Sequence, residues 1–580
     1  MKFILDIIKN AVTAVMNLII NRVMVFRGRK SVHELDGKSK DAVNISEKLL
    51  FRLLDENKDT VYGKKYGFAD IHSIEEYKEK VPFSDYDTYE PYIKQMTEEN
   101  AENLITVRKP YHYALSSGSV GVPKHIPVSE EELTKYRKFG TNMCFGVADE
   151  YYRNTTGRSF RNGFGFNLIE LKFGETKSGI PKGAISGTIL KPLKDLIQYF
   201  VVPSWDVISP QKDMDLKYLR ARYALSRRNL TFIDGAFMTA VVDIMDYVCA
   251  NWEMLCEDIA QGTINPKIEI PDDLRSKFEK SFAPDPERAE ELVREFQKGF
   301  DRIVPRIWPD IQFVASIGTG GFFTYTKRMR HYTGRNIPFN NLTYAASEGL
   351  FATARHMGDT SYVLIPDGGF YEFIPVKSED ETKTLTIDQL EEGEEYEIVV
   401  TNLSGFYRYR IKDVIRVTGF YNEAPMIEFI YRKSQLLSIE GEKTNEEAVR
   451  WTIEQTMKVT GIRVNDYSVY ADTDTEPGHY TFIIEPDKII PIGEREHIRD
   501  VLEEKLMQAN PSFGDKIRRG ILGKTELVTV QQQTYQLYRD YMITKGVSPN
   551  QLKPVRVIDT PIKHNFFFSL KEVKDGQAGE

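Results

Sequence analysis

Residues 116–124 read Ser-Ser-Gly-Ser-Val-Gly-Val-Pro-Lys and place three hydroxyl side chains, two glycines and a lysine close together. Glycine lets a backbone approach a ligand closely. Successive N–H groups and serine hydroxyls can surround phosphate oxygens, while a lysine adds positive charge. The run differs from the pattern Gly-x-x-x-x-Gly-Lys-Ser/Thr, because no hydroxyl residue follows Lys124. The run favours a phosphate-binding loop, and the structural alternative is a polar turn between strands.

Three more groups of chemistry-bearing residues follow this loop along the chain. They are Tyr344-Ala-Ala-Ser347-Glu348, the stretch from Gly405 to Asp413, and the stretch from Val547 to Arg556. Taken singly, each group has a structural explanation. Glu348 could cap the start of a helix, Gly405 to Asp413 could form an exposed strand, and Lys553 could be a surface lysine.

Together and in this order, the four motifs resemble the auxin-responsive promoter family of acyl-acid amido synthetases. This family belongs to the adenylate-forming superfamily, which also contains luciferase and acyl-CoA synthetases. The motifs run from about residue 111 to residue 556, so the resemblance covers most of the chain. It implies an α/β fold with a large, multi-layer N-terminal adenylate-forming domain, a smaller, mobile α+β C-terminal lid domain, and an active site between them.

The resemblance also implies a two-step reaction that uses ATP. A carboxylic acid first attacks ATP to give an acyl-adenylate and pyrophosphate, and an amine, usually an amino acid, then displaces AMP to form an amide. The acid is expected to be small or medium-sized and hydrophobic. Two alternatives stay open: transfer of the acyl group to a thiol of coenzyme A or a carrier protein, and a non-catalytic relative that binds a nucleotide or an acid.

The nucleotide site implied by the resemblance draws on all four motifs and on the segment Ile317 to Gly321. The residues expected to bind ATP are Ser116, Ser117, Gly118, Ser119, Gly121, Thr319, Gly320, Tyr344, Ser347, Tyr407, Arg408, Asp413 and Arg432. Tyr344 is expected beside the adenine, and Asp413 is expected to accept hydrogen bonds from the ribose hydroxyls. Two positions depart from the family pattern: Val120 replaces Ser or Thr, and Lys412 replaces the Gly before the aspartate.

Four charged residues are expected to act on the phosphates. Glu348 would hold Mg²⁺, because a hard cation beside phosphates needs a carboxylate oxygen. The predicted catalytic residues are Lys124 in the loop, Lys443 beyond the hinge and Lys553 in the lid. Gln435 is the candidate hinge residue, about which the lid would rotate between the two steps.

Size and composition are consistent with this assignment. A chain of 580 residues exceeds what one core usually organises, so several domains are expected. The net charge of −8 argues against a general nucleic-acid binder and leaves small molecules as the expected partners. Three cysteines without a CxxC pair and nine histidines without HExxH give no disulfide or zinc pattern, so a reducing cytoplasm is expected.

The expected domains follow changes in sequence texture. Residues 1–35 form an N-terminal amphipathic helix, 36–432 the adenylating domain, 433–572 the lid and 573–580 a disordered tail. Helices are predicted at 213–228, 238–260, 284–304, 444–458 and 493–508. Strands are predicted at 311–317, 341–346, 361–365, 371–376, 465–471 and 480–485.

The N-terminal helix is rich in Ile, Leu, Val and Met. Its longest uncharged run, residues 10–21, is too short to span a bilayer. The favoured interpretation is a helix partly buried against the protein, and contact of residues 1–30 with a membrane surface or a partner is the less favoured alternative.

Overall fold

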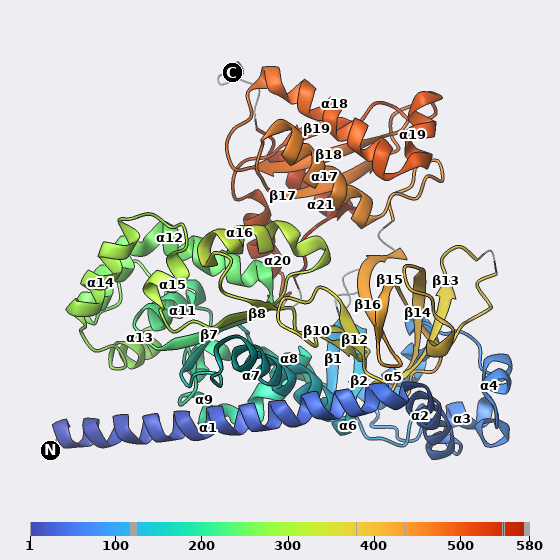
Figure 1. The fold of residues 1–580 in the computed structure, drawn as a ribbon, viewed down its shortest axis with the longest axis horizontal. Helices are drawn as coiled ribbons and strands as arrows, with labels where there is room; N and C mark the ends of the chain where they lie inside the picture. Colours follow the sequence, from blue (N-terminus) through green and yellow to red (C-terminus); the bar gives the residue numbers. More distant parts are fainter. Residues whose placement is uncertain are drawn as a thin grey trace. The chain divides into compact units, whose positions relative to one another are not determined.

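The computed structural model describes residues 2–116, 124–378, 380–433, 436–547, 549 and 552–572, and side chains from residue 8 onward (Figure 1). The chain divides into two compact units. Unit 1 comprises Met1–Ile317, Met329–Ile411 and Ile415–Glu428; unit 2 comprises Gly318–Arg328, Lys412–Val414 and Phe429–Glu580. The mixed α/β class is as predicted. Two short segments that sequence texture assigned to the large domain belong to unit 2, and the predicted tail lies outside the described residues.

Unit 1 begins with helices. α1 spans Lys2–Lys38, α2 Ala42–Asn57, α3 Val61–Lys65, α4 Ile74–Lys80 and α5 Tyr86–Glu98. Leu49, Leu50, Leu53 and Leu54 of α2 are buried, as their helical spacing predicts. A capping box between Asp85 and Thr88 starts α5 by satisfying backbone N–H groups.

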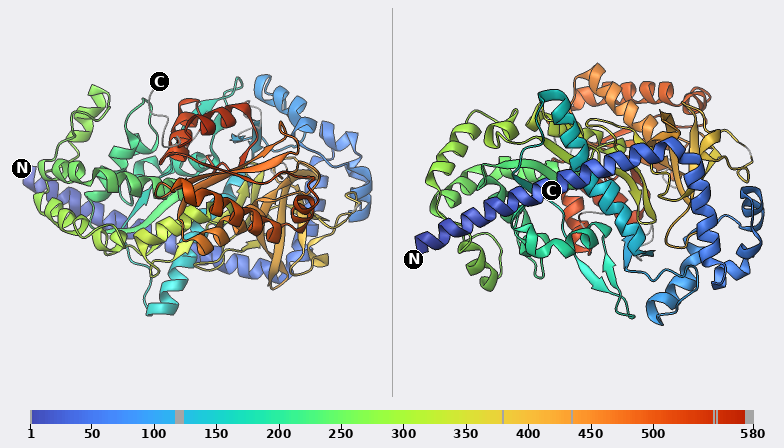
Figure 2. Two further views of the ribbon diagram at one scale, coloured as in Figure 1. Left: turned by 90° about the horizontal axis from the view of Figure 1, so that it is seen from above. Right: turned by 60° about the horizontal axis from the view of Figure 1, so that its bottom comes forward.

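α1 packs along α7 (Met143–Thr156), and the views in Figure 2 show it as one long rod lying against unit 1. A side chain at Gly28 would meet the backbone of Gly146, so the two helices cross at close contact. The predicted helix is present. An amphipathic helix packed on a protein normally buries its apolar side chains, but here Asn17 and Asn21 are buried, whereas Val15 and Phe26 are exposed.

A parallel sheet with strand order β6-β3-β7-β8-β9 forms one core of unit 1. Its strands are β3 Phe164–Asn167, β6 Val201–Val202, β7 Leu230–Phe237, β8 Phe313–Ile317 and β9 Phe339–Asn340. Parallel strands need crossover connections, which include α11 (Leu216–Leu225), α12 (Met238–Gln261) and α14 (Pro286–Phe296). The predicted helix 284–304 ends earlier, at Phe296, and a separate helix, α15, covers Ile303–Ile307.

Two further sheets carry the predicted motifs. A four-stranded sheet has the order β2-β1-β5-β4, and a seven-stranded sheet has the order β10-β11-β12-β16-β15-β14-β13. Their strands are β1 His112–Ser116, β2 Lys124–Val128, β4 Phe173–Glu175, β5 Pro181–Gly183, β10 Thr343–Ala346, β11 Gly349–Thr353, β12 Tyr362–Leu364, β13 Phe370–Pro375, β14 Glu395–Thr401, β15 Tyr409–Tyr421 and β16 Ala424–Arg432.

Unit 2 has an α+β core. Its sheet has the order β19-β18-β17-β20, with β17 Val464–Asp472, β18 His479–Pro486, β19 Glu526–Thr529 and β20 Val557–Ile558. Its helices are α16 (Phe323–Thr333, which continues into unit 1), α17 (Glu446–Thr460), α18 (Ile492–Ala509), α19 (Pro511–Arg518), α20 (Thr534–Thr544) and α21 (Pro561–Ser569). Buried side chains of α17, α18, β17 and β18 form one apolar core, so the predicted alternation of helix and strand is correct here.

Candidate active site

The predicted phosphate loop connects two paired strands. β1 and β2 are antiparallel, and Ser116 lies opposite Lys124 at the end of the pair. Ser117, Gly118, Ser119 and Gly121 lie outside the described residues. The Lys124 ammonium lies 4.8 Å from the centre of the Tyr86 ring, and the hydroxyl of Tyr86 accepts a hydrogen bond from the His125 N–H. The strand pair therefore fixes both ends of the loop.

Glu348 lies in the turn of a β-hairpin. β10 and β11 pair from Thr343 opposite Thr353 to Ala346 opposite Gly349, so Ser347 and Glu348 form the connection. The helix-cap alternative is wrong, because a strand follows. The Tyr409 hydroxyl donates to the Glu348 carboxylate at 3.2 Å, and the Asn402 side-chain amide donates to the Glu348 carbonyl at 2.7 Å. These contacts fix the orientation of the turn.

Tyr344, the candidate for stacking on adenine, is on the same hairpin. Its side chain is 8% exposed, and its ring centre lies 5.9 Å from that of Phe351. A bulge follows Tyr344 in the β10–β11 register, and such irregularities redirect side chains near functional sites. Tyr344 and Ser347 therefore share one short element with the candidate metal ligand.

A helical segment missed by the sequence analysis supports this hairpin. α6 (Glu130–Lys135) continues into a π-helical stretch, Tyr136–Asn142. The Tyr136 hydroxyl donates to the Ala346 carbonyl at 2.8 Å, and the Leu350 N–H donates to the Glu132 carboxyl at 3.0 Å. Burial raises the pKa of Glu132 to about 8. The sequence analysis did not identify Glu132 as buried, because it is one of three consecutive glutamates.

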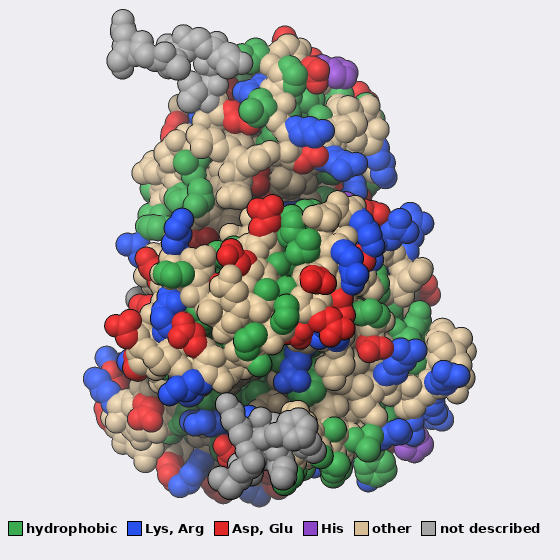
Figure 3. Space-filling model, turned by 90° about the vertical axis from the view of Figure 1, so that its left-hand side faces the viewer, with side chains coloured by type: hydrophobic (Ala, Val, Ile, Leu, Met, Phe, Trp, Pro, Cys, Tyr) green, Lys and Arg blue, Asp and Glu red, His purple; other side chains and the backbone are tan. Residues whose placement is uncertain are grey.

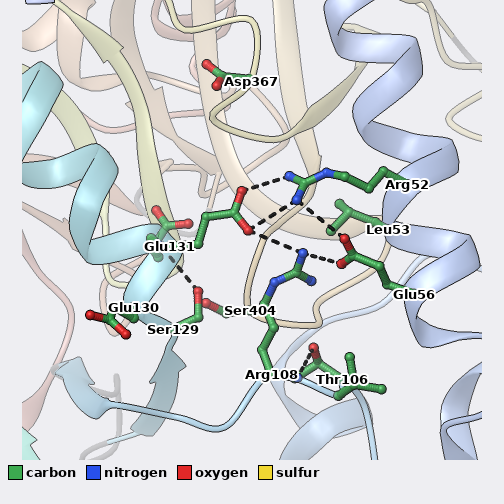
Figure 4. Close-up of polar contacts among 12 residues, drawn as sticks. Arg52, Leu53, Glu56, Thr106, Arg108, Ser129, Glu130, Glu131, Asp367 and Ser404 are labelled. Carbon is green, nitrogen blue, oxygen red and sulfur yellow. Dashed lines mark hydrogen bonds and ion pairs between the residues drawn. The ribbon is translucent and has the colours of Figure 1, made fainter.

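An ion-pair network ties α6 to α2, as Figure 4 shows. Arg52 of α2 contacts Glu131 at 2.8 Å, and Arg108 contacts both Glu131, at 3.3 Å, and Glu56. Burial opposes ionisation of Glu131, but Arg52 and Arg108 hold its pKa below the ordinary value. The pKa values of the neighbouring residues Glu131 and Glu132 are thus changed in opposite directions. α6 contacts α2 through Glu131 and the β10–β11 hairpin through Glu132.

Tyr407 and Arg408, which are predicted to contact the nucleotide, have structural partners within unit 1. Tyr407 is fully buried, stacks on Tyr62 at 5.2 Å between ring centres, and donates to the Ile105 carbonyl. Arg408 is 4% exposed and makes two hydrogen bonds, at 2.9 and 3.0 Å, to the carboxylate of Glu372, itself 1% exposed. The contacts of both side chains that the structure shows are with other protein groups. Both side chains position the start of β15, where Tyr409 supports Glu348.

Asp413 and Arg432, both in unit 2, are in direct contact. The Asp413 side chain is 4% exposed, and its carboxylate accepts a 2.6 Å hydrogen bond from the Arg432 guanidinium, which is 36% exposed. Lys412 has φ of +67°, the left-handed conformation that favours glycine. The departure from the family's usual Gly is therefore accommodated with the same kind of backbone.

The glycine segment with Thr319 and Gly320 follows β8 and leads into α16. Gly320 has φ of +59°. Arg556, buried in unit 2, donates to the Gly321 carbonyl at 3.1 Å and to the Asp466 carboxylate at 2.6 Å. Arg556 closes the fourth motif, but the sequence alone gave it no role. The segment is therefore fixed by the same stretch that carries Lys553.

Two predicted catalytic lysines are exposed in unit 2. Lys553 lies close enough to Glu446 to oppose, together with Arg556, the rise in the carboxyl pKa caused by burial. Lys443, with φ of +51°, ends a turn closed by hydrogen bonds between Leu437 and Thr444. The Glu442 carboxylate accepts from two backbone N–H groups within this turn. Gln435 lies outside the described residues.

The residues described contain no group of three or more His, Cys, Asp or Glu side chains that could hold a metal alone. Mg²⁺ is commonly bound by one or two carboxylates together with substrate phosphates. The oriented carboxylate of Glu348 is a suitable donor.

Most phenylalanines on and beside β3 and β7 are core residues. Phe164, Phe166 and Phe232 are at most 4% exposed, and Phe232 stacks on Phe313 with ring centres 5.5 Å apart. Phe237 is half-buried.

Comparison with known families gives three consecutive matches. The GH3 family N-terminal domain matches residues 31–339, the GH3 family central domain residues 362–432, and the GH3 family C-terminal domain residues 446–562. These matches cover well over half of the chain.

Similar curated proteins span almost the whole chain. "Probable indole-3-acetic acid-amido synthetase GH3.1" of Arabidopsis thaliana is 27% identical over 92% of both chains. "Jasmonoyl--L-amino acid synthetase JAR4" of Nicotiana attenuata is 25% identical over 94% of this chain and 96% of its own. The solved structure "AtGH3.15 acyl acid amido synthetase in complex with 2,4-DB" has a TM-score of 0.81 at 24% identity, covering 94% of this chain and 96% of its own, so the fold is shared.

Proposed function

The chain belongs to the GH3 family, and we propose that it is an ATP-dependent, AMP-forming ligase that joins a carboxylic acid to an amine. The observation that carries this proposal is the ordered match of all three family domains. The amido synthetases similar to it along nearly its whole length support the same reaction class.

In the first step, a carboxylate oxygen attacks the α-phosphorus of ATP, and the bond to the pyrophosphate leaving group breaks. Negative charge rises on the phosphate oxygens, so catalysis depends on positioning and on positive or N–H groups. We assign this task to the loop between Ser116 and Lys124, whose ends are fixed by the β1–β2 pair. Mg²⁺, held by Glu348, would neutralise phosphate charge.

Other residues hold the nucleoside. Asp413 is the proposed acceptor for the ribose hydroxyls, and Arg432 orients its carboxylate through a hydrogen bond of 2.6 Å. Tyr344 is the proposed neighbour of the adenine, and Thr319 and Gly320 are the proposed backbone contacts. Lys553 and Lys443 are exposed cations on unit 2 and are proposed to reach the nucleotide in one of the two steps.

In the second step, the amine nitrogen attacks the acyl carbon and AMP leaves with the bonding electron pair. We propose a small or medium-sized hydrophobic acid and an amino acid as substrates. The similar proteins are named as an indole-3-acetic acid-amido synthetase and a jasmonoyl-amino acid synthetase. We further propose a cytoplasmic setting, where ATP is available and cysteines stay reduced; the sequence has three cysteines and no CxxC pair.

Acid-dependent exchange of labelled pyrophosphate into ATP tests the first step. A panel of hydrophobic acids should contain at least one that promotes exchange, and no exchange by folded protein across the panel would contradict the proposal. Product mass after addition of amino acids or coenzyme A then tests the acceptor. An amide supports the proposal, whereas a thioester alone would replace it.

A further inference from the structure

Two asparagines on the inner face of α1 form hydrogen bonds to other segments of unit 1. The Asn17 side-chain amide donates to the carbonyls of Gly163 and Tyr199, both at 2.9 Å. The Asn21 amide donates to the carbonyls of Gly163 at 3.1 Å and Asn17 at 2.8 Å. Asn17 and Asn21 are 7% and 2% exposed. The helix is therefore held by these specific hydrogen bonds together with inward-facing apolar side chains such as Val25, which is 6% exposed and packs in a core of unit 1.

The outer face of α1 is apolar. Seven large apolar side chains between residues 8 and 26 are 41–57% exposed: Ile8, Val12, Val15, Leu18, Ile19, Val23 and Phe26. At about 100° per residue they share one stripe, opposite Asn17 and Asn21. A surface helix of a soluble protein normally has the reverse arrangement. A contiguous exposed apolar stripe of this kind marks an interaction surface.

The charge of this segment is opposite to that of the chain. Residues 1–33 contain six Lys or Arg and one Asp, whereas the whole protein has a net charge of −8. Arg22, Arg27 and Lys30 are exposed beside the stripe. Acidic and basic side chains are interspersed on the face shown in Figure 3, so a basic excess is not a general property of the surface.

We propose that the outer face of α1, residues 8–26, binds to the surface of an anionic lipid bilayer. Apolar side chains would enter the acyl boundary while the flanking Arg and Lys meet lipid phosphates. A second copy of the chain is a poorer occupant, because a symmetric contact would bring two basic segments together.

The helix lies along the bilayer rather than crossing it. In the described part of the chain, one helical stretch, Ile8–Asn57, is long and apolar enough by length and composition to cross a membrane. Insertion of this helix across the bilayer would break the hydrogen bonds of Asn17 and Asn21. It would also bury the charged Arg22 in hydrocarbon, which costs free energy. Figure 2 shows α1 lying against unit 1 over much of its length, which leaves one side for the lipid.

Vesicle flotation of the full-length protein tests the proposal. Phosphatidylcholine vesicles are compared with vesicles that also contain phosphatidylglycerol, at low and high salt. The protein should float with the anionic vesicles, more weakly at high salt, because screening weakens charge attraction. Arg22→Gln/Arg27→Gln/Lys30→Gln should weaken partitioning by roughly fivefold for each charge removed.

The apolar contribution has a matched control. Val12→Gln/Val15→Gln/Ile19→Gln should abolish flotation, whereas Val459→Gln/Ile489→Gln/Leu537→Gln, which changes equally exposed apolar residues of unit 2, should leave it intact. Circular dichroism and acid-dependent pyrophosphate exchange should be unchanged in both, which separates this proposal from the proposed function.

Three results would overturn the proposal. The first is no flotation with either kind of vesicle. The second is a dimer in light scattering that the α1 triple variant dissociates, because a second copy would then cover the stripe. The third is resistance of membrane-bound protein to alkaline carbonate extraction, because that would indicate a spanning helix.

Discussion

Glu348 and Asp413 are two carboxylates proposed to serve the same nucleotide, yet their surroundings differ. Glu348 is at a hairpin turn and accepts a hydrogen bond from a phenol, Tyr409. Asp413 is buried within a strand and accepts from a guanidinium, Arg432. A phenol orients a carboxylate without cancelling its charge, which suits a metal ligand. A guanidinium compensates the charge and leaves an oriented acceptor, which suits hydroxyl recognition.

The largest expected effect is on Glu348. Glu348→Gln keeps an acceptor for Tyr409 but removes the charge, so pyrophosphate exchange should fall about 10²–10³-fold. Excess Mg²⁺ should restore part of the rate. Tyr409→Phe should cost far less, because it removes only the orienting hydrogen bond. Equal losses in the two variants would mean that orientation rather than charge is the contribution of Glu348.

Substitution of Arg408 tests the buried ion pair that positions the start of β15, where Tyr409 contacts Glu348. Arg408→Leu leaves Glu372 buried and unpaired, so the free energy of unfolding should drop by about 3–5 kcal/mol in chemical denaturation followed by tryptophan fluorescence. Arg408→Leu/Glu372→Leu should recover much of this loss. Arg52→Gln, a change in an ion pair whose arginine is 42% exposed, should cost less than about 1 kcal/mol. A loss in Arg408→Leu no larger than in Arg52→Gln would contradict the structural role.

Substitution of Asp413 is expected to weaken the binding of ATP. Asp413→Asn should raise the KM for ATP by about tenfold, with a smaller change in kcat, because it weakens charge-assisted hydrogen bonds. Arg432→Leu should have a smaller effect on KM if Arg432 only orients the carboxylate. A larger effect for Arg432→Leu than for Asp413→Asn would transfer the ribose contact to the arginine.

The same comparison shows what a sequence can and cannot reveal. Glu348 and Asp413 are predicted from ordered motifs, and their roles stay predictions. Tyr407 and Arg408 belong to an equally distinctive motif, but the motif did not indicate their buried protein partners. Burial depends on partners far along the chain, such as Tyr62 and Glu372. Arg556 lies in a predicted motif and Glu132 does not, but the roles of both were missed for the same reason: their partners lie far along the chain.

The reversed polarity of α1 has the same origin. Composition predicted the helix correctly, and an apolar helix is usually buried by its apolar side. The outcome depended instead on two asparagines whose partners, Gly163 and Tyr199, are more than a hundred residues away. The sequence therefore predicted an amphipathic helix, but only tertiary contacts decided that the apolar stripe faces outward.

Glu132 predicts a pH effect on the support of the Glu348 hairpin. Its pKa rises on folding to about 8, so the folded state keeps a proton that the unfolded state loses above about pH 4.5. Stability should therefore fall as the pH rises toward 8. Glu132→Gln cannot ionise, so its gain over the parent should grow from less than about 1 kcal/mol at pH 5 to about 4 kcal/mol at pH 8.

Glu131, the neighbour with the opposite shift, is the control for this prediction. Its pKa is lowered in the folded state, so its charge stabilises the fold at neutral pH. Glu131→Gln should therefore lower stability at pH 8. Thermal unfolding between pH 5 and pH 8 measures both variants, and a gain for Glu131→Gln or none for Glu132→Gln would contradict the assignment.

The smallest expected effect concerns Lys412, the residue before Asp413. A left-handed backbone costs an L-residue about 1–2 kcal/mol, whereas glycine adopts it freely but loses more entropy on folding. Lys412→Gly should therefore raise stability by about 0.5–1 kcal/mol. Lys412→Ala is the control and should give no gain, because alanine keeps the strain. The KM for ATP should stay constant in both, since the Asp413–Arg432 contact needs the backbone shape and not the lysine; a changed KM would show that Lys412 itself contacts the nucleotide.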